Sequence, residues 1–157
     1  SEKGAWDAMF WMGGLVALAT ALAKSGFIAW IAKLIGTAVA AADMGWVASF
    51  VLISLIYIYS HYCFASVTAR ISAMYAAFVA VAAACGVPAM LVAITFGCFA
   101  NLPISLTHYG NGCGPVYFVA GYVSQGEWWR NGFIITTINV VIWLTIGMTW
   151  WKFIGLY

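Results

Sequence analysis

The chain has 157 residues, of which 66% are hydrophobic and only 6% are charged, and its formal net charge is +2. Soluble domains carry roughly 25% charged residues, so this composition excludes a soluble globular domain, a disordered chain and a nucleic-acid-binding protein. It predicts an all-α integral membrane protein surrounded by a lipid bilayer. Because the chain is short and starts at Ser1, we expect it to be a piece of a larger membrane protein.

Two helices are predicted before the central region. Residues 6–22 form an apolar run close to the roughly 20 residues that cross a bilayer, and they predict a first transmembrane helix. Residues 27–35 are apolar around Lys33, but they are too few to span a bilayer. We expect an interfacial helix here, with Trp30 at the depth of the lipid headgroups.

Residues 46–85 predict a helical hairpin. They have few polar interruptions, yet one straight helix of that length would measure about 60 Å, roughly twice the hydrocarbon thickness. The chain must therefore turn, and the turn is predicted at a central polar cluster of Ser60, His61, Ser66, Thr68, Arg70 and Ser72. Two short arms, 46–59 and 71–85, indicate a re-entrant hairpin, and two ordinary spans joined by a surface loop are the alternative. A non-helical tip at membrane depth must face protein or a water-filled cavity, which makes it a candidate binding site.

Residues 87–123 predict a broken transmembrane helix. Apolar residues 89–100 and 116–123 flank a stretch that is rich in glycine and proline. The residues that cannot continue a regular helix are Gly110, Gly112, Gly114 and Pro115. A hydrophobic segment interrupted by glycine and proline is the best sequence pointer to a binding site in a transporter.

The chain closes with a predicted polar loop and a final span. Residues 125–131 are predicted as an interfacial loop that carries Glu127, Trp128, Trp129 and Arg130. Residues 132–151 predict the last transmembrane helix, which ends in an aromatic belt.

The hairpin tip has groups that suit an anion. Ser66 and Thr68 supply hydroxyls, and a second arm that begins at Val67 would point its N-terminal partial positive charge at the tip. The carbonyls that end the first arm suit a cation. Arg70 is costly among apolar membrane residues, so we expect it to face the interior and offer a fixed cation to a carboxylate. The alternatives are that both hydroxyls only satisfy nearby backbone and that Arg70 snorkels to an interface.

The remaining polar residues leave two competing interpretations open. His61 and His108 suit proton carriage, metal or haem ligation, or structural hydrogen bonds. None of the four cysteines forms a CxxC pair, so no metal site is expected. A nucleophile triad, a phosphate loop and paired carboxylates are all absent from the sequence, so an enzyme is not expected. The competing interpretations are a haem- or quinone-binding membrane subunit that uses both histidines, and a membrane anchor without a site.

Two motifs carry a resemblance to a known family. Residues 60–70 (Ser-His-Tyr-Cys-Phe-Ala-Ser-Val-Thr-Ala-Arg) and 106–118 (Leu-Thr-His-Tyr-Gly-Asn-Gly-Cys-Gly-Pro-Val-Tyr-Phe) resemble the divalent anion:sodium symporter family. They look closest to its bacterial and plastid dicarboxylate exchangers, such as 2-oxoglutarate/malate translocators, and residues 121–123 and 150–157 also look like that branch. The resemblance implies an elevator transporter of two inverted repeats, usually a homodimer, with a Ser-Asn-Thr motif at each hairpin tip.

The resemblance covers the chain and implies that it is the last part of the second repeat. Residues 1–45 match a scaffold-type transmembrane helix and an interfacial helix, and residues 46–157 match part of the transport domain. The first repeat and its hairpin are missing, so we expect that this piece alone does not transport.

The resemblance also implies site residues by position. Ser66, Val67 and Thr68 stand where the family's Ser-Asn-Thr motif binds a substrate carboxylate, and backbone at Ala65 and Thr107 lies where the family holds Na⁺. The implied substrate-binding residues are Ser66, Val67, Thr68, Arg70, Thr107, His108, Gly110, Asn111 and Pro115. Because Val67 lacks the asparagine amide and Arg70 adds a cation, we hypothesise that Arg70 partly replaces the ion, which fits obligate exchange.

The leading prediction is the C-terminal part of a secondary transporter for di- or tricarboxylates of the malate, 2-oxoglutarate, succinate, tartrate or citrate class. We expect anion exchange by an elevator-type alternating-access mechanism, with Na⁺ as the one candidate co-transported ion. The expected location is the bacterial inner membrane, with the plastid envelope as the alternative.

Overall fold

The structure, a computed structural model, describes residues 6, 10, 13, 14, 17, 18, 20–22, 24–42 and 44–157. Every regular element in these residues is a helix, as the composition predicts. Three helical segments within the described residues are long and apolar enough to cross a membrane: Trp46–Cys63, Val67–Ala84 and Gln125–Phe153. The predicted span over residues 6–22 falls largely outside the described residues and stays a prediction.

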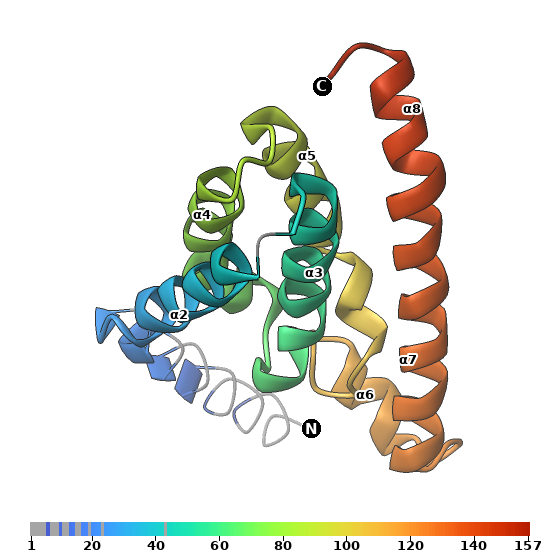
Figure 1. Cartoon of the computed structure of the whole chain (residues 1–157). Coiled ribbons are helices and arrows are strands. Elements are labelled where there is room, and N and C mark those ends of the chain that lie inside the picture. The colour runs from blue at the N-terminus through green and yellow to red at the C-terminus, as the bar shows by residue number, and fades with distance from the viewer. Residues whose placement is uncertain are drawn as a thin grey trace.

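Helix α2 (Phe27–Ala41) lies against α4 (Val67–Ala84), as Figure 1 shows. It is longer than the predicted segment 27–35 because the alanine-rich residues that follow favour a helix. Gly36 allows close packing of the two helices, since a Cβ at this position would lie 3.1 Å from Val81 Cγ1.

The hairpin consists of two helices joined by a short turn. Helix α3 (Trp46–Tyr59) continues into a 3-10 turn, η1 (Ser60–Cys63), and α4 begins at Val67. The irregular backbone between the two arms is therefore confined to residues 64–66.

The second arm of the hairpin begins at Val67, the start on which the expectation of a partial positive charge at the tip depends, and not at residue 71. Ser66 caps α4, because its hydroxyl accepts the backbone N–H of Ala69 at 3.4 Å. The arm predicted from residue 71 onward therefore gains a turn. As a result Thr68 and Arg70 lie inside the helix and not in the connection.

Aromatic side chains hold the hairpin against α5 (Ala89–Phe99). The ring of Tyr57 stacks on the ring of Phe96 with centroids 4.6 Å apart, and Phe78 packs against Tyr57 at 5.7 Å. Phe50 completes the cluster from the first arm at 6.4 Å from Phe96. All four side chains are buried, and each such burial contributes about 1.5–3 kcal/mol.

The region after α5 is a helix with an interruption. A 3-10 turn, η2 (Leu102–Ser105), follows α5, and residues 106–113 are irregular before α6 (Gly114–Val119) begins. Gly114 is required at the start of α6, because a Cβ there would collide with the carbonyl oxygen of His108.

The last helix starts before the predicted residue 132. Helix α7 (Gln125–Ile142) includes the segment predicted as a polar loop, and that prediction is wrong. The cause is a capping box, in which the backbone N–H of Ser124 donates to Glu127 Oε2 at 2.9 Å and the N–H of Glu127 donates to Ser124 Oγ at 3.4 Å. These bonds satisfy N–H groups that would otherwise lack partners at the helix start.

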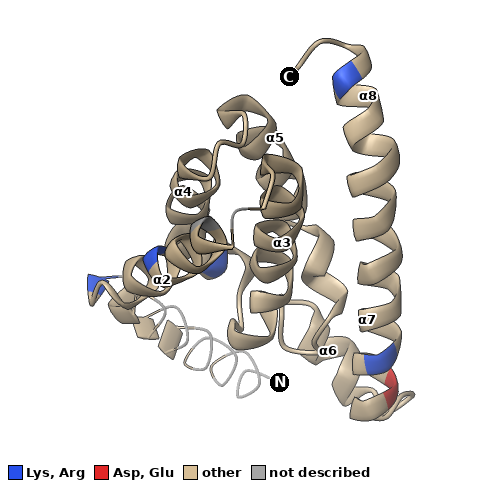
Figure 2. Ribbon diagram, viewed as in Figure 1, with Lys and Arg blue, Asp and Glu red and all other residues tan. Residues whose placement is uncertain are grey.

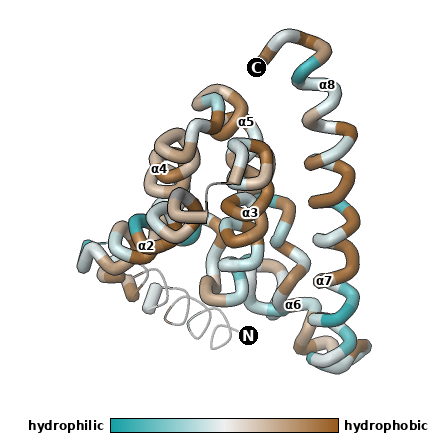
Figure 3. Tube along the Cα trace, in the orientation of Figure 1, coloured by the Kyte–Doolittle hydropathy of each residue, from teal (hydrophilic) through white to brown (hydrophobic). Residues whose placement is uncertain are grey.

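The α7 helix continues as one long column at the edge of the molecule (Figure 1). A π-helical turn, η3 (Trp143–Gly147), joins it to α8 (Met148–Phe153). Glu127 lies in the first turn of α7 and Lys152 in the last turn of α8, and Figure 2 shows charged residues at both ends of the column. The apolar stretch between them, brown in Figure 3, fits a helix that crosses a membrane.

Helix α7 rests on η2 through a glycine. A Cβ at Gly132 would collide with the carbonyl oxygen of Ser105. One turn later, the hydroxyls of Thr136 and Ser105 lie 3.4 Å apart. This close approach places the first turns of α7 beside the interrupted region.

Candidate binding site at the hairpin tip and the helix break

The hairpin tip borders a hollow of about 340 Å³. Its lining residues from the hairpin are Cys63, Phe64, Ala65, Ser66 and Ala69, and Leu18 and Leu22 close it from the N-terminal side. Ligand pockets for small molecules start at roughly 300 Å³. Of the predicted site residues, Ala65 and Ser66 therefore lie at a hollow of suitable size, with Val67 half-buried and Thr68 exposed next to them.

Arg70 lies beneath the tip and is fully buried. Its Nη1 donates to the carbonyl of Tyr57 at 2.9 Å, and its Nη2 donates to the carbonyls of Phe99 at 3.2 Å and Ala100 at 2.7 Å. The guanidinium carbon also lies 4.7 Å from the centre of the Tyr57 ring. The alternative that Arg70 snorkels to an interface is therefore wrong. Of its donors, only Nε has no partner among the described residues.

The acceptors of Arg70 sit at the C-terminal ends of α3 and α5. The last carbonyls of a helix have no partner within the helix, and they carry partial negative charge. Arg70 is the one buried charge among the described residues. It neutralises these helix ends and ties both arms of the hairpin to the end of α5.

Turn η1 meets the break at a buried contact whose polar side-chain atoms have no hydrogen-bond partner among the described residues. His61 and Thr107 are fully buried, and neither the His61 nitrogens nor Thr107 Oγ1 has a partner among the described residues. Both lie against Gly110, where a Cβ would collide with His61 Nε2 and come within 2.9 Å of Thr107 Oγ1. Buried polar groups are normally paired, so this contact is a second candidate binding point.

Asn111 organises the break through its side chain. Its Oδ1 accepts the backbone N–H groups of Cys113 at 2.8 Å and Gly114 at 2.7 Å, and its Nδ2 donates to the carbonyl of Ile104 at 3.3 Å. The Asn111 amide, which is predicted to bind substrate, therefore forms hydrogen bonds with backbone groups of residues 104, 113 and 114. Pro115 lies half-buried in the first turn of α6.

His108 is enclosed by aromatic rings from three elements. Trp129 Nε1 of α7 donates to His108 Nδ1 at 3.2 Å, and the ring of Phe118 from α6 stacks on the imidazole with centroids 4.3 Å apart. The Tyr109 ring meets it edge-on at 5.1 Å. The sequence prediction missed Trp129, because residues 125–131 were assigned to an interfacial loop. The Ser124–Glu127 capping box was the signal that extends α7 to this residue.

The hairpin tip and the break lie next to each other. The hydroxyl of Tyr109 donates to the carbonyl of Tyr62 at 3.0 Å, and the rings of Tyr62 and Trp129 lie 5.8 Å apart. Tyr62 belongs to η1, directly before the tip. The fold therefore brings η1, which directly precedes the hairpin tip, against the break that carries the other predicted site residues.

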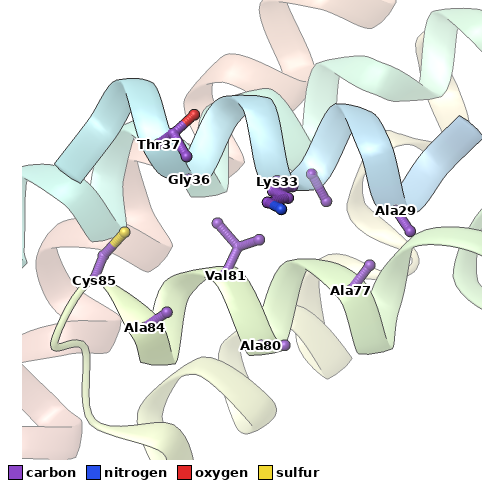
Figure 4. A pocket seen from close by; sticks show the side chains of 10 residues that line it. Ala29, Lys33, Gly36, Thr37, Ala77, Ala80, Val81, Ala84 and Cys85 are labelled. Atoms are coloured by element: carbon purple, nitrogen blue, oxygen red, sulfur yellow. The ribbon is translucent and has the colours of Figure 1, made fainter. Parts of the chain in front are cut away.

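A separate groove of about 480 Å³ lies between α2 and α4 (Figure 4). Small apolar side chains line most of it, and Lys33 is its one charged residue. None of the predicted site residues lines this groove. Its chemistry does not match the polar contacts at the tip and the break.

Comparison with known proteins identifies relatives of the whole chain. The family model for the sodium:sulfate symporter transmembrane region matches residues 1–157. The chain is 44% identical over 157 residues to "Dicarboxylate transporter 1, chloroplastic" of Spinacia oleracea, covering 100% of this chain and 28% of the relative. It is 44% identical over 156 residues to "Putative malate transporter YflS" of Bacillus subtilis (strain 168), covering 99% of this chain and 32% of the relative. The chain thus spans about a third or less of the length of these relatives.

The competing interpretations lack support from these matches. The relatives carry transporter names, and none of those described above is a haem or quinone protein. Within the part of the chain that the structure describes, no group of three or more His, Cys, Asp or Glu side chains is placed to hold a metal ion.

Proposed function

The chain belongs to the family of the sodium:sulfate symporter transmembrane region, and we propose that it forms part of a secondary transporter for di- or tricarboxylates. The match confirms the resemblance to divalent anion:sodium symporters. Relatives with dicarboxylate and malate in their names support a carboxylate substrate. The names and organisms of these relatives point to plastids and to a bacterium, so the proposed location is the bacterial inner membrane or the plastid envelope.

The observation that carries the proposal is the hollow at the hairpin tip. It is bordered by Ser66, whose hydroxyl caps α4, and by the N-terminus of that helix. The first N–H groups of a helix are free to bind an anion, and the helix dipole favours negative charge there. We propose that one substrate carboxylate binds here, at Ser66, Val67 and Thr68. The other end of the substrate then faces Thr107 and the residues of the break that follow it.

We also propose that transport is an exchange of anions. Arg70 donates to carbonyls at the ends of two helices, which is where transporters commonly coordinate a mobile cation. A resident guanidinium supplies positive charge permanently, so substrate binding does not need Na⁺ to neutralise these helix ends. The family description names sodium. Co-transported Na⁺, coordinated by backbone at Ala65 and Thr107, is therefore the alternative.

The remaining parts of the proposal concern the complete protein. We propose a homodimer that alternates access by an elevator-type movement of a transport domain, to which residues 46–157 contribute the outer hairpin and the broken helix. The lipid bilayer and the missing first repeat are the necessary partners. The single-chain piece is not expected to transport by itself.

The test is uptake of labelled malate, 2-oxoglutarate, succinate, tartrate and citrate into proteoliposomes of the complete parent protein. We expect uptake of at least one of these anions. Ser66→Ala removes the hydroxyl at the tip and should reduce uptake roughly tenfold, the loss expected for a hydrogen bond to a charged group. Ser72→Ala, exposed on the same helix, is the matched control. Absence of uptake for all five anions, or equal effects of the two substitutions, would contradict the proposal.

A further inference from the structure

The hydrogen bond between Trp129 and His108 determines where the imidazole carries its proton. Trp129 Nε1 lies 3.2 Å from His108 Nδ1. An indole N–H can only donate, so Nδ1 must be the acceptor and carries no proton. The neutral imidazole therefore has its proton on Nε2. Protonation of both nitrogens would require this bond to break.

The orientation of the ring is fixed as well. Phe118 stacks on the imidazole at an interplanar angle of 28°, and Tyr109 meets it at 79°. Trp129 is itself held by the Tyr62 ring at 5.8 Å. Stacking from one side and a hydrogen bond in the plane together leave the imidazole little freedom to rotate.

The Nε2–H of His108 has no protein acceptor. The residue is half-buried, and no hydrogen bond from Nε2 to a described residue is present. An oriented donor without an acceptor, placed beside the hairpin tip, is suited to a ligand oxygen. We propose that Trp129 is a positioning residue, which holds His108 as a neutral donor whose Nε2–H binds a carboxylate oxygen of the transported anion. This inference rests on the proposed function.

The neutral state has a functional consequence. A neutral donor recognises the anion through a hydrogen bond and contributes no charge to the site. The titratable and charged groups on the elements around this cluster are His61, Tyr62, Cys63, Tyr109, Cys113, Tyr117, Glu127 and Arg130. Of these, the Tyr109 hydroxyl is engaged with the Tyr62 carbonyl, Glu127 is engaged with Ser124, and Arg130 is exposed.

The test uses the complete parent protein in proteoliposomes and measures KM and maximal rate for a labelled dicarboxylate that the wild-type protein takes up. Trp129→Phe keeps an aromatic ring and removes the N–H. We expect its KM to rise about fivefold at neutral pH, as for one lost hydrogen bond. Nδ1 then has no donor facing it, so the imidazole is no longer held in one orientation or one tautomer.

Three further variants separate positioning from structural support. His108→Gln places an amide N–H near the position of Nε2, so KM should stay near the wild-type value. Trp129→Phe in the His108→Gln background should then have no further effect on KM. Trp128→Phe, on the same helix as Trp129, is the matched control. The Trp128 ring contacts Phe118 at 6.0 Å, and the substitution should leave KM unchanged. A KM for Trp129→Phe equal to that of the wild-type protein, or an equal loss in both backgrounds, would overturn the inference.

A spectroscopic measurement makes the inference independent of transport. In parent protein with ¹⁵N-labelled histidine in lipid, the His108 signal is assigned by comparison with His108→Gln. We expect a protonated Nε2 and an unprotonated Nδ1, and a mixture of both forms in Trp129→Phe. A protonated Nδ1 in the wild-type protein would overturn the inference even if dicarboxylate uptake is observed. Absence of dicarboxylate uptake with the expected nitrogen signals would instead contradict the proposed function.

Discussion

Arg70 and Ala100 are joined by a hydrogen bond of 2.7 Å from the guanidinium to the backbone carbonyl. This bond ties the first turn of α4 to the end of α5, and a second bond to the carbonyl of Tyr57 adds the end of α3. The carbonyls concerned have no partners within their own helices. One buried cation therefore holds the hairpin against the broken helix, which explains why a charge is tolerated in an apolar interior.

Removal of the Arg70 donors should destabilise the protein. Arg70→Met keeps an unbranched apolar chain but removes the donor of the Phe99 and Ala100 carbonyls, and it leaves the Tyr57 carbonyl with the Ser60 hydroxyl as its side-chain donor. An unpaired buried acceptor costs about 1–3 kcal/mol, so the loss should be at least of that size. Thermal unfolding of the purified parent protein measures this as a lower melting temperature. Arg130→Met, at an exposed position, is the control, and the same melting temperature for both variants would refute the structural role of Arg70.

Close packing of α7 on η2 predicts a strict requirement for glycine at position 132. A Cβ there would collide with the carbonyl oxygen of Ser105. We expect Gly132→Ala to destabilise the protein by about 1–3 kcal/mol, as overpacking does. Gly126→Ala on the same helix meets no atom within 4 Å and should be neutral or slightly stabilising. Denaturation of the two variants in parallel measures their stabilities. Equal stability of the two variants would show that α7 does not approach η2 so closely.

The contact of Gly110 with His61 predicts that transport depends on a small residue in the break. Gly110→Ala would push a methyl group into the imidazole and the Thr107 hydroxyl. We expect at least about a tenfold loss of uptake, because displaced site groups lose their alignment. Gly97→Ala, which meets nothing within 4 Å, should retain uptake. Restoration of part of the loss by His61→Ala in the Gly110→Ala background would identify this contact as the cause, and absence of any restoration would argue against it.

The capping box predicts a local effect at the start of α7. Ser124→Ala removes the hydroxyl that accepts the N–H of Glu127 and should cost about 1 kcal/mol of helix stability. Backbone amide hydrogen exchange should accelerate in the first turns of α7, up to Trp129, and remain unchanged near Val140. Exchange that rises equally along the whole helix would contradict a local cap.

The interruptions of the helices were predictable from the sequence, since their signals are local. The irregular residues 64–66 follow the polar cluster at Ser60 and His61, and the irregular residues 106–113 include glycines that cannot continue a helix. The start of α7 was placed too late because tryptophans and charges at residues 125–131 are typical of a membrane interface. The capping box at Ser124 is an equally local signal and indicates the observed start.

The partners of the site residues could not be predicted in the same way. The sequence predicts that Arg70 faces the interior, yet its acceptors are backbone carbonyls, and these have no side-chain signature. The bond between Trp129 and His108 depends on how α7 packs beside the break. Such pairings follow from tertiary packing, and residue identity alone does not determine them.

We propose that Arg70 acts as a resident cation, so that the complete transporter exchanges carboxylates without Na⁺. The most direct measurement is the rate at which labelled dicarboxylate enters proteoliposomes of the parent protein, with and without internal unlabelled dicarboxylate and with and without Na⁺. We predict uptake that requires internal dicarboxylate and is unchanged by Na⁺, and Arg70→Ala should abolish it or make it dependent on Na⁺. Uptake into empty vesicles driven by Na⁺, or an Arg70→Ala variant that still exchanges without Na⁺, would contradict the claim.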